Sequence, residues 1–477
     1  MNIIRVTNTY SWLLSDDKVL LDKLYRSLRV RGRNYFMSTA YKKKLWDGYI
    51  EFFKKNTGMF LTGLLPEVVA ALRHWKHEYV YDDQRPAAHW LHKDIDDQFL
   101  NKWLPEGQPP VTLYDYQVDY VKQAVKFGRG LITAPTGGGK TNVLISIMKC
   151  MPPKTPTLFI TKNSGLVDQN YQEMLKWNME GLGRYYGGYK EPNYVMCVTS
   201  HKDTFAGIQK LLPKFKALIV DEVHECMSDV PISVYKKMTG ATLRFGISAT
   251  PFKYDGKDLE QKFNVKGHFG GVFKTTTTES GYLTTKELQG RGILSASRCV
   301  FYPINQPDTI QHEPYGDAVT IGIANNFYFL DIIRRLAESL EGRTLILVER
   351  IDQGDYLKQL LPDAHWIRGK DKLDDRANVF KELKTGKGVI AIAMRHIITA
   401  GINVFLNNLI NASGGNAEHT IIQQMGRGLR TADDKDQLNY YDFIFKTNQY
   451  LEDHSMNRIK TLDIQGHQIT IKQEIDF

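Results

Sequence analysis

Cysteine is scarce in this chain, with four residues among 477. Cys150, Cys197, Cys226 and Cys299 are widely spaced and form no CxxC pair, which argues against a disulfide framework and against a zinc site. The thirteen histidines show no HxxxH spacing and no clustering with cysteine. The sequence therefore favours a reducing, cytoplasmic compartment and predicts no transition-metal site.

Long apolar runs are also missing. None approaches the ~20 residues that a membrane-spanning helix needs, and the first ten residues lack the charged-then-apolar layout of a signal peptide. We expect a soluble protein with no membrane partner. No repeat of 20–50 residues is visible, and a content of 42% hydrophobic and 24% charged residues excludes a disordered or low-complexity chain.

The charge is positive overall and unevenly distributed. The net charge is +9, and residues 18–55 alone carry eleven lysines and arginines against three acids. A concentrated positive charge indicates a polyanionic partner, and we expect Arg29, Arg31 and Arg33 to contact phosphate groups of such a partner. The alternative is a solvated charged face, which is the commoner fate of such runs.

Three sections differ in pattern. Residues 1–105 mix short helix and strand signals, with a hairpin expected from 49–53 and 59–65, and a Pro/Gly-rich linker follows at 104–110. After it, amphipathic helices alternate with short, wholly apolar strands, a pattern typical of parallel sheets covered by helices. We therefore predict an α/β protein with three domains: residues 1–105, 106–305 and 306–477.

A glycine-rich loop supplies the strongest local signal. Residues 134–141 read Ala-Pro-Thr-Gly-Gly-Gly-Lys-Thr and lie between a predicted strand and a predicted helix. Glycines let backbone N–H groups surround a phosphate, and the helix N-terminus adds positive charge. Lys140 would pair with the β- and γ-phosphates, and the Thr141 hydroxyl would ligate Mg²⁺. The loop by itself predicts only a nucleoside triphosphate site.

Two further segments fit that prediction. The apolar run 217–220 ends in Asp221 and Glu222, which places carboxylates at the ligand-binding edge of a sheet. Asp221 would hold Mg²⁺, and Glu222 would orient the attacking water. Arg427 and Arg430 are three residues apart, so both can face one anion from a helix, and arginine suits the charge on a transferring phosphoryl group.

The ordered set of segments resembles the motifs of superfamily 2 helicases and translocases, across about residues 111–445. Five further segments match the motifs called Ia, Ib, III, IV and V in that family: 161–169, 198–201, 248–251, 345–348 and 398–403. Motif V departs from the pattern, because Asn403 stands where many relatives carry an acid. Motif II reads Asp-Glu-Val-His, unlike the Asp-Glu-Ala-Asp of the large class of RNA unwinding enzymes.

The resemblance implies an ATP-hydrolysing DNA helicase with two tandem RecA-like parallel-sheet domains, preceded by a small N-terminal α+β DNA-binding domain. ATP and Mg²⁺ would lie between the RecA-like domains, with Thr141 and Asp221 on the metal. The implied catalytic residues are Lys140, Asp221, Glu222, Arg427 and Arg430. The implied nucleotide-binding residues are Tyr114, Gln117, Thr136, Gly137, Gly138, Gly139, Lys140, Thr141 and Gly401. The implied nucleic-acid contacts of the motor are Lys162, Ser200, His201 and Thr399.

The N-terminal segments 45–53 and 57–65 are similar to the small domain that precedes the motor in bacteriophage UvsW-type branch-migration helicases. This similarity implies forked or Holliday-type DNA as the substrate, in recombination and repair, and the cytoplasm of a host cell as the location. Three alternatives stay open: a duplex translocase without strand separation, an RNA helicase, and a binding module that ATP switches without movement. Aromatic residues interleave with the basic ones, either to stack on unpaired bases or as core, and for Trp46 core is favoured: Tyr35, Phe36, Tyr41 and Trp46.

Overall fold

The structure is a computed structural model with two compact units. The first unit consists of Met1–Ala134 and Gly139–Tyr282, and the second consists of Pro135–Gly138 and Leu283–Phe477. The structure describes residues 1–88, 91–252, 258–368, 371, 378–383, 386, 388–395, 406–415, 422, 425, 429 and 437–477. Within these residues no helix is long and apolar enough to cross a membrane.

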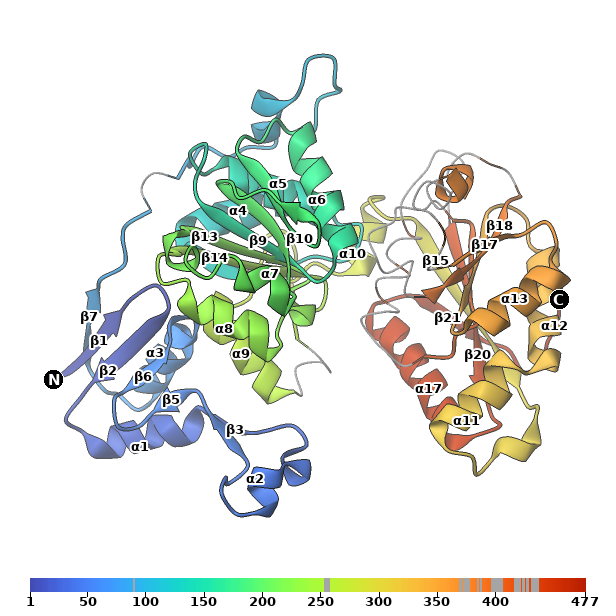
Figure 1. The fold of residues 1–477 in the computed structure, drawn as a ribbon, viewed down its shortest axis with the longest axis horizontal. Coiled ribbons are helices and arrows are strands. Elements are labelled where there is room, and N and C mark those ends of the chain that lie inside the picture. Colours follow the sequence, from blue (N-terminus) through green and yellow to red (C-terminus); the bar gives the residue numbers. More distant parts are fainter. Residues whose placement is uncertain are drawn as a thin grey trace. The chain divides into compact units, whose positions relative to one another are not determined.

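The N-terminal domain is built on a five-stranded sheet with the order β5-β6-β2-β1-β7 (Figure 1). Strand β1 pairs antiparallel with β2 and parallel with β7. Two amphipathic helices, α1 (Lys18–Ser27) and α3 (Leu65–His74), bury their apolar faces in one cluster with the sheet. The strands are β1 (Asn2–Val6), β2 (Tyr10–Leu14), β5 (Phe53–Lys54), β6 (Met59–Leu61) and β7 (Tyr79–Asp83).

A second, two-stranded sheet projects from this domain. Strands β3 (Arg29–Arg31) and β4 (Tyr49–Glu51) pair antiparallel and enclose residues 32–48, which contain the short helix α2 (Thr39–Lys42). The expected hairpin is thus only half confirmed, because β5 pairs with β6 whereas residues 49–51 pair with β3. The guanidinium group of Arg29 lies 3.8 Å from the Tyr49 ring centroid, a cation–π contact that favours the observed pairing.

The first α/β domain confirms the predicted parallel sheet. Its seven strands follow the order β11-β10-β12-β9-β13-β14-β8, and every neighbouring pair except β10–β11 is parallel. The strands are β8 (Arg129–Thr133), β9 (Thr157–Thr161), β10 (Leu182–Tyr186), β11 (Tyr189–Lys190), β12 (Val195–Thr199), β13 (Ala217–Asp221) and β14 (Leu243–Ser248). The helices are α4 (Asp115–Phe127), α5 (Lys140–Lys149), α6 (Ser164–Lys176), α7 (Lys202–Ala206), α8 (Asp229–Lys237) and α9 (Leu259–Phe269).

The second α/β domain repeats this architecture. Its described strands form one parallel sheet with the order β17-β18-β16-β19-β20-β15-β21. Strand β15 (Ala296–Ile304) lies inside this sheet and therefore belongs to the second unit. The main segment of that unit is Leu283–Phe477, which begins ahead of the expected boundary at 306. The other strands are β16 (Thr344–Val348), β17 (His365–Ile367), β18 (Ile390–Met394), β19 (Asn408–Asn411), β20 (Gln437–Phe445) and β21 (Gln468–Ile471). Its helices include α10 (Thr285–Gly290), α11 (Tyr315–Val319), α12 (Phe327–Ser339), α13 (Ile351–Leu360) and α17 (Gln449–Ile464).

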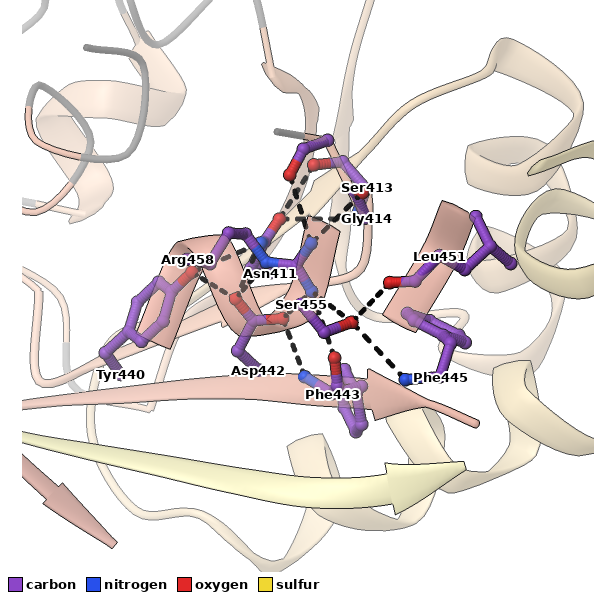
Figure 2. Close-up of polar contacts among 11 residues, drawn as sticks. Asn411, Ser413, Gly414, Tyr440, Asp442, Phe443, Phe445, Leu451, Ser455 and Arg458 are labelled. Atoms are coloured by element: carbon purple, nitrogen blue, oxygen red, sulfur yellow. Dashed lines mark hydrogen bonds and ion pairs between the residues drawn. The ribbon is translucent and has the colours of Figure 1, made fainter. Parts of the chain in front are cut away.

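A buried ion pair anchors helix α17 to this sheet (Figure 2). The Arg458 guanidinium donates to both carboxylate oxygens of Asp442, at 2.7 and 2.8 Å, and both side chains are fully buried. It also donates to the carbonyl oxygens of Gly414 and Gly415, at 3.1 and 3.0 Å. One side chain therefore joins α17, β20 and the segment that follows β19.

Two arginines, of which Arg244 is fully buried, fix the N-terminal domain to the first α/β domain. Arg244, at the start of β14, donates to the Thr9 hydroxyl at 2.8 Å and to the Met238 carbonyl at 2.6 Å. Arg129, at the start of β8, donates to the Asn8 carbonyl at 2.5 Å. These contacts lie at the amino ends of the two strands. The turn between β1 and β2 is thereby held at the edge opposite to the one where ligands bind in such folds.

His268 sits beside this interface and makes the first unit sensitive to acid. Its ring is 1% exposed and lies 5.4 Å, centroid to centroid, from the Tyr235 ring. Burial, together with the charges of Arg244, Lys236 and Arg129, holds the pKa of His268 well below its usual 6.5. The unfolded chain therefore binds this proton more readily. The stability that follows from a neutral His268 is present above pH 6.5 and is lost as the pH falls below it.

We expect the free energy of unfolding of the first unit to decrease by up to about 1.4 kcal/mol per pH unit below pH 6.5 on account of His268. Urea unfolding at pH 8.0 and pH 5.5 measures the loss, and the variant His268→Phe should lose less. Exposed His74, replaced by Phe, is the control and should keep the wild-type pH dependence. Equal losses in wild type and His268→Phe would contradict this prediction.

Candidate functional site

The predicted phosphate-binding and acidic segments meet at one edge of the first sheet. Strands β8, β14 and β13 are consecutive neighbours in it and run parallel, so their carboxyl ends lie side by side. The glycine-rich loop follows β8, Asp221 ends β13, and Ser248 ends β14. Strand order therefore brings together residues that are separated by up to about a hundred positions in the sequence.

The glycine-rich loop has the backbone expected of a phosphate cradle. Gly137 and Gly139 have φ angles of 86° and 70°, which are left-handed values that glycine adopts without strain. Gly139 caps helix α5, whose first residues are Lys140 and Thr141. The Thr141 side chain is exposed. The loop thus places a lysine, a hydroxyl and the N-terminus of a helix at one point.

Lys140 and Glu222 face each other across this edge. The Lys140 Nζ lies 3.9 Å from Glu222 Oε1 and donates to the Ala134 carbonyl at 3.2 Å. Glu222 has φ 47° and ψ 54°, a left-handed conformation that costs a non-glycine residue about 1–3 kcal/mol. The sheet end holds this strained backbone and thereby sets the direction of the carboxylate.

Asp221 is a carboxyl group that needs a cation. Burial and the neighbouring charge of Glu222 raise its pKa to about 6, and Lys140, the Glu222 N–H and the Asn170 amide oppose this shift. The amide of Asn170, on α6, approaches Asp221 Oδ2 at 3.4 Å. Ionised Asp221 is therefore stabilised only in part by the protein. An added divalent cation would complete the compensation, which fits carboxylate and hydroxyl ligands for Mg²⁺.

A chain of hydrogen bonds links Glu222 to the end of β14. Ser248 Oγ donates to Glu222 Oε2 at 3.2 Å, and His224 Nδ1 lies 2.8 Å from the same serine oxygen. The Thr250 N–H also donates to Ser248 Oγ, at 3.0 Å. The sequence had identified these segments as motifs without predicting that their side chains touch. Asn170 was missed because a single asparagine in an amphipathic helix carries no signal.

Gln117 contacts the glycine-rich loop, and Tyr114 contacts Gln117. Gln117 is fully buried, its Oε1 accepts from the Tyr114 N–H at 2.9 Å, and its Nε2 donates to the Gly139 carbonyl at 3.2 Å. A Cβ at Gly139 would lie 2.1 Å from Gln117 Nε2, so this approach requires glycine. The Tyr114 ring is 45% exposed and stacks on Tyr116 at 5.6 Å, which leaves an aromatic surface beside the loop.

The predicted nucleic-acid contacts of the first domain also lie close together. Strands β12 and β9 are neighbours, and the Ser200 N–H donates to the Thr161 carbonyl at 2.8 Å. Lys162 and His201 follow these strand ends and are exposed. Lys162 forms an ion pair with Glu225 at 3.0 Å. This half of the sheet edge therefore carries motifs Ia and Ib, beside the half with the phosphate loop and the acids.

The three N-terminal arginines are largely occupied by protein partners. Arg29 forms an ion pair with Asp47 at 2.7 Å, and Arg31 donates to the Tyr35 hydroxyl at 2.8 Å. Arg33 lies 3.8 Å from Asp258, which precedes α9. These contacts favour a role in holding the 32–48 segment in place, and they reduce the positive charge that these arginines present to DNA phosphates.

Four predicted residues lie outside the part of the chain that the structure describes: Thr399, Gly401, Arg427 and Arg430. Their neighbours Met425 and Leu429 are described and buried, and the Ser295 N–H donates to the Leu429 carbonyl at 2.8 Å. Thr136 and Gly138 lie within the glycine-rich loop, and the Thr136 Oγ1 is buried without a hydrogen-bond partner among the described residues. A buried hydroxyl of this kind fits a phosphate oxygen as its partner.

Comparison with known proteins agrees with this geometry. Residues 110–253 match the family described as Type III restriction enzyme, res subunit. A Rad25-type DNA 3'-5' helicase of Haloarcula marismortui is 26% identical over 334 residues, which cover 68% of this chain and 51% of that protein. The ATP-dependent DNA helicase uvsW of Enterobacteria phage T4 is 22% identical over 435 residues, which cover 86% of this chain and 84% of that protein.

This chain thus spans about half the length of the Haloarcula relative. A solved fragment of an HsdR-type subunit of a type I restriction enzyme from Vibrio vulnificus shares the fold, with a TM-score of 0.56 at 19% identity, over 80% of this chain and 71% of that chain. The matched family, the relatives and the ordered motifs agree with one another. This chain is therefore similar to DNA helicases of the Rad25 and uvsW kinds, which supports the resemblance to superfamily 2.

Proposed function

We propose that this protein is an ATP-driven DNA helicase or translocase that remodels forked and branched DNA. The observation that carries the proposal is the joint placement of Lys140, Asp221 and Glu222 at the carboxyl ends of neighbouring strands. The adjacent strand ends of the same sheet edge carry Lys162 and Ser200. One rigid edge thus combines a hydrolytic site with a surface for a phosphate backbone.

The residues of this edge, together with Tyr114, Gln117, Arg427 and Arg430, would divide the tasks of ATP binding and hydrolysis. Lys140 and the N–H groups at the start of α5 would bind the β- and γ-phosphates, and Glu222 would orient and polarise the attacking water. Thr141 and Asp221 would hold Mg²⁺, which would supply positive charge next to the phosphates. Arg427 and Arg430 would stabilise the charge of the transition state. Tyr114 and Gln117 would contact the adenine ring.

Coupling to DNA would use the contact between Ser248 and Glu222. Ser248 ends β14, and its hydroxyl contacts both Glu222 and His224. A change at Glu222 upon hydrolysis is therefore transmitted to β14, whose other end holds the N-terminal domain through Arg244. Lys162, Ser200, His201 and Thr399 would grip phosphates without reading bases, which suits movement along any sequence.

DNA as the substrate, rather than RNA, is supported by the relatives, which are named as DNA helicases. The name of the Haloarcula protein specifies 3'-5' movement, and we propose the same polarity here. Forked and branched DNA is favoured by the N-terminal domain, which adds a second, positively charged binding surface outside the motor.

ATPase and unwinding assays on matched substrates test this function. We expect forked DNA and Holliday junctions to stimulate ATP hydrolysis more than blunt duplex, and an RNA duplex to stimulate it least. Unwinding of forks with only one single-stranded tail, either 3' or 5', reports the polarity. Equal stimulation by RNA duplex and forked DNA would contradict the proposal, and ATP hydrolysis on blunt duplex without strand separation would favour a duplex translocase.

A further inference from the structure

The segment between β3 and β4 carries an open pocket that the hydrolytic site does not use. Its volume is about 540 Å³, within the range of small-ligand pockets. Phe36, Tyr41 and Trp46 supply aromatic walls, and Lys42, Lys44 and Leu45 complete most of the lining. Phe36 and Leu45 are 57% and 79% exposed. Large apolar side chains so exposed at one place indicate a binding surface.

The aromatic walls are held in a fixed frame. The Trp46 Nε1 donates to the Tyr49 carbonyl at 2.7 Å, and the ring packs against Gly32. Tyr35 lies behind the pocket and contacts both the Phe36 and the Tyr41 ring edge-to-face, with centroids at 5.8 and 4.8 Å. The pocket is thus formed before any ligand arrives, which lowers the entropic cost of binding.

Backbone strain points to the same segment. Asn34 and Lys44 have φ angles of 55° and 56°, which non-glycine residues adopt at a cost. Gly48 closes the segment with φ 83°, where a Cβ would lie 2.8 Å from the Tyr35 ring. Strained residues persist where the surrounding structure fixes them, and they cluster at binding and active sites.

The charge around the pocket is suited to an anion. Lys42, Lys43 and Lys44 are exposed, and none of them has a carboxylate at ion-pair distance among the described residues. Asp47 is the single acid of the lining, and Arg29 neutralises it at 2.7 Å. The basic charge here therefore remains available, in contrast to that of Arg29 itself.

We propose that this pocket receives one unpaired base of a DNA strand, with the base against Phe36 and Tyr41 and the adjoining phosphates on Lys42 and Lys44. Aromatic rings with flanking cations are the usual combination for single strands, because every base has a π face. This inference rests on the proposed function, since it makes the N-terminal domain the part that detects unpaired DNA at a junction. Arg29 and Arg31 of β3 then stabilise the pocket through their contacts with Asp47 and Tyr35.

The test is a binding titration without ATP, with a duplex that carries 2-aminopurine as a single unpaired base. We expect the 2-aminopurine fluorescence to change on binding to wild type. Phe36→Ala should weaken binding about tenfold, because it removes the ring on which the base stacks. Affinity for a fully paired duplex should stay within twofold. The double variant Lys42→Glu, Lys44→Glu should also weaken binding and reduce its salt dependence.

Matched controls come from the same unit. Phe127→Ala is the control for Phe36→Ala, because Phe127 is another phenylalanine beside a lysine and is 53% exposed. The double variant Lys18→Glu, Lys23→Glu is the control for the lysine variant, because it reverses two charges on α1. The proposal is overturned if these controls weaken binding as much as the pocket variants, or if Phe36→Ala weakens paired and unpaired DNA equally. It is also overturned if Phe36→Ala only dissociates a dimer of the chain.

Failure of the proposed function would be visible separately. Absence of DNA-stimulated ATPase in wild type would contradict the motor. The fluorescence titration needs no hydrolysis and would still decide whether the pocket takes a base.

Discussion

Replacing Glu222 with glutamine is expected to lower the DNA-stimulated ATPase rate by about 10²–10⁴-fold, the usual contribution of a general base. Glutamine has the same shape and can still accept the hydrogen bond from Ser248 Oγ, which is 3.2 Å long in the wild type. It lacks the negative charge that polarises water. Nucleotide binding should therefore persist or become tighter, because the repulsion between this carboxylate and the phosphates is gone.

The measurement is the steady-state ATPase rate with saturating forked DNA, together with the dissociation constant of a fluorescent ATP analogue. Glu225→Gln is the matched control, since Glu225 lies three residues on and pairs with Lys162 rather than with Lys140. Its ATPase rate should stay within a few-fold of wild type. Lys140→Ala should lose both hydrolysis and tight nucleotide binding while DNA binding remains. A Glu222→Gln enzyme with near wild-type ATPase would exclude Glu222 as the water-orienting residue.

Replacing Arg458 with methionine is expected to lower the free energy of unfolding of the second unit by about 3–5 kcal/mol. The substitution leaves the Asp442 carboxylate buried without its cation, although Tyr440 Oη and Asn411 Nδ2 still donate to it, at 2.6 and 3.0 Å. The carbonyl groups of Gly414 and Gly415 lose their donor as well (Figure 2). We expect the segment after β19 to become less protected.

Hydrogen exchange across a urea series measures this effect in peptides from β20 and α17, because one unfolding midpoint does not describe a chain of several domains. Arg334→Met is the control: Arg334 pairs with Asp331 and Glu338 on the surface of α12 and should contribute less than about 1 kcal/mol. The double variant Arg458→Met, Asp442→Leu should recover part of the loss, since no buried charge remains unpaired. An Arg458→Met chain as stable as Arg334→Met would refute the anchoring role.

Much of the fold follows from local sequence. The short apolar strands predicted parallel sheets, and both seven-stranded sheets confirm this, because a strand buried on both faces has no polar alternation. The phosphate loop was predictable for a similar reason. The loop consists of glycines, a lysine and a threonine in consecutive positions, and it binds phosphate through one continuous stretch of backbone. Gly137, Gly139 and Lys140 can therefore be recognised without any distant partner.

Other features depended on segments that are far apart in the chain. β4 pairs with β3 instead of β6, and the Arg29–Tyr49 contact, which no hairpin rule contains, supports this pairing. The predicted domain boundary at 306 falls after β15, a strand whose partners β20 and β21 come more than a hundred residues later. Neither feature has a signature within its own segment.

The nucleotide loop, the acidic pair and the helicase motif order are readable in the amino-acid sequence, since each of these is a local pattern. The folded chain was needed to see that Ser248 and His224 adjoin Glu222, that Arg244 ties the N-terminal domain to the far end of the same strand, and that Arg29 is occupied by Asp47. Strand order accounts for most of this difference. It sets which distant side chains become neighbours, and therefore which charges are left free to meet DNA.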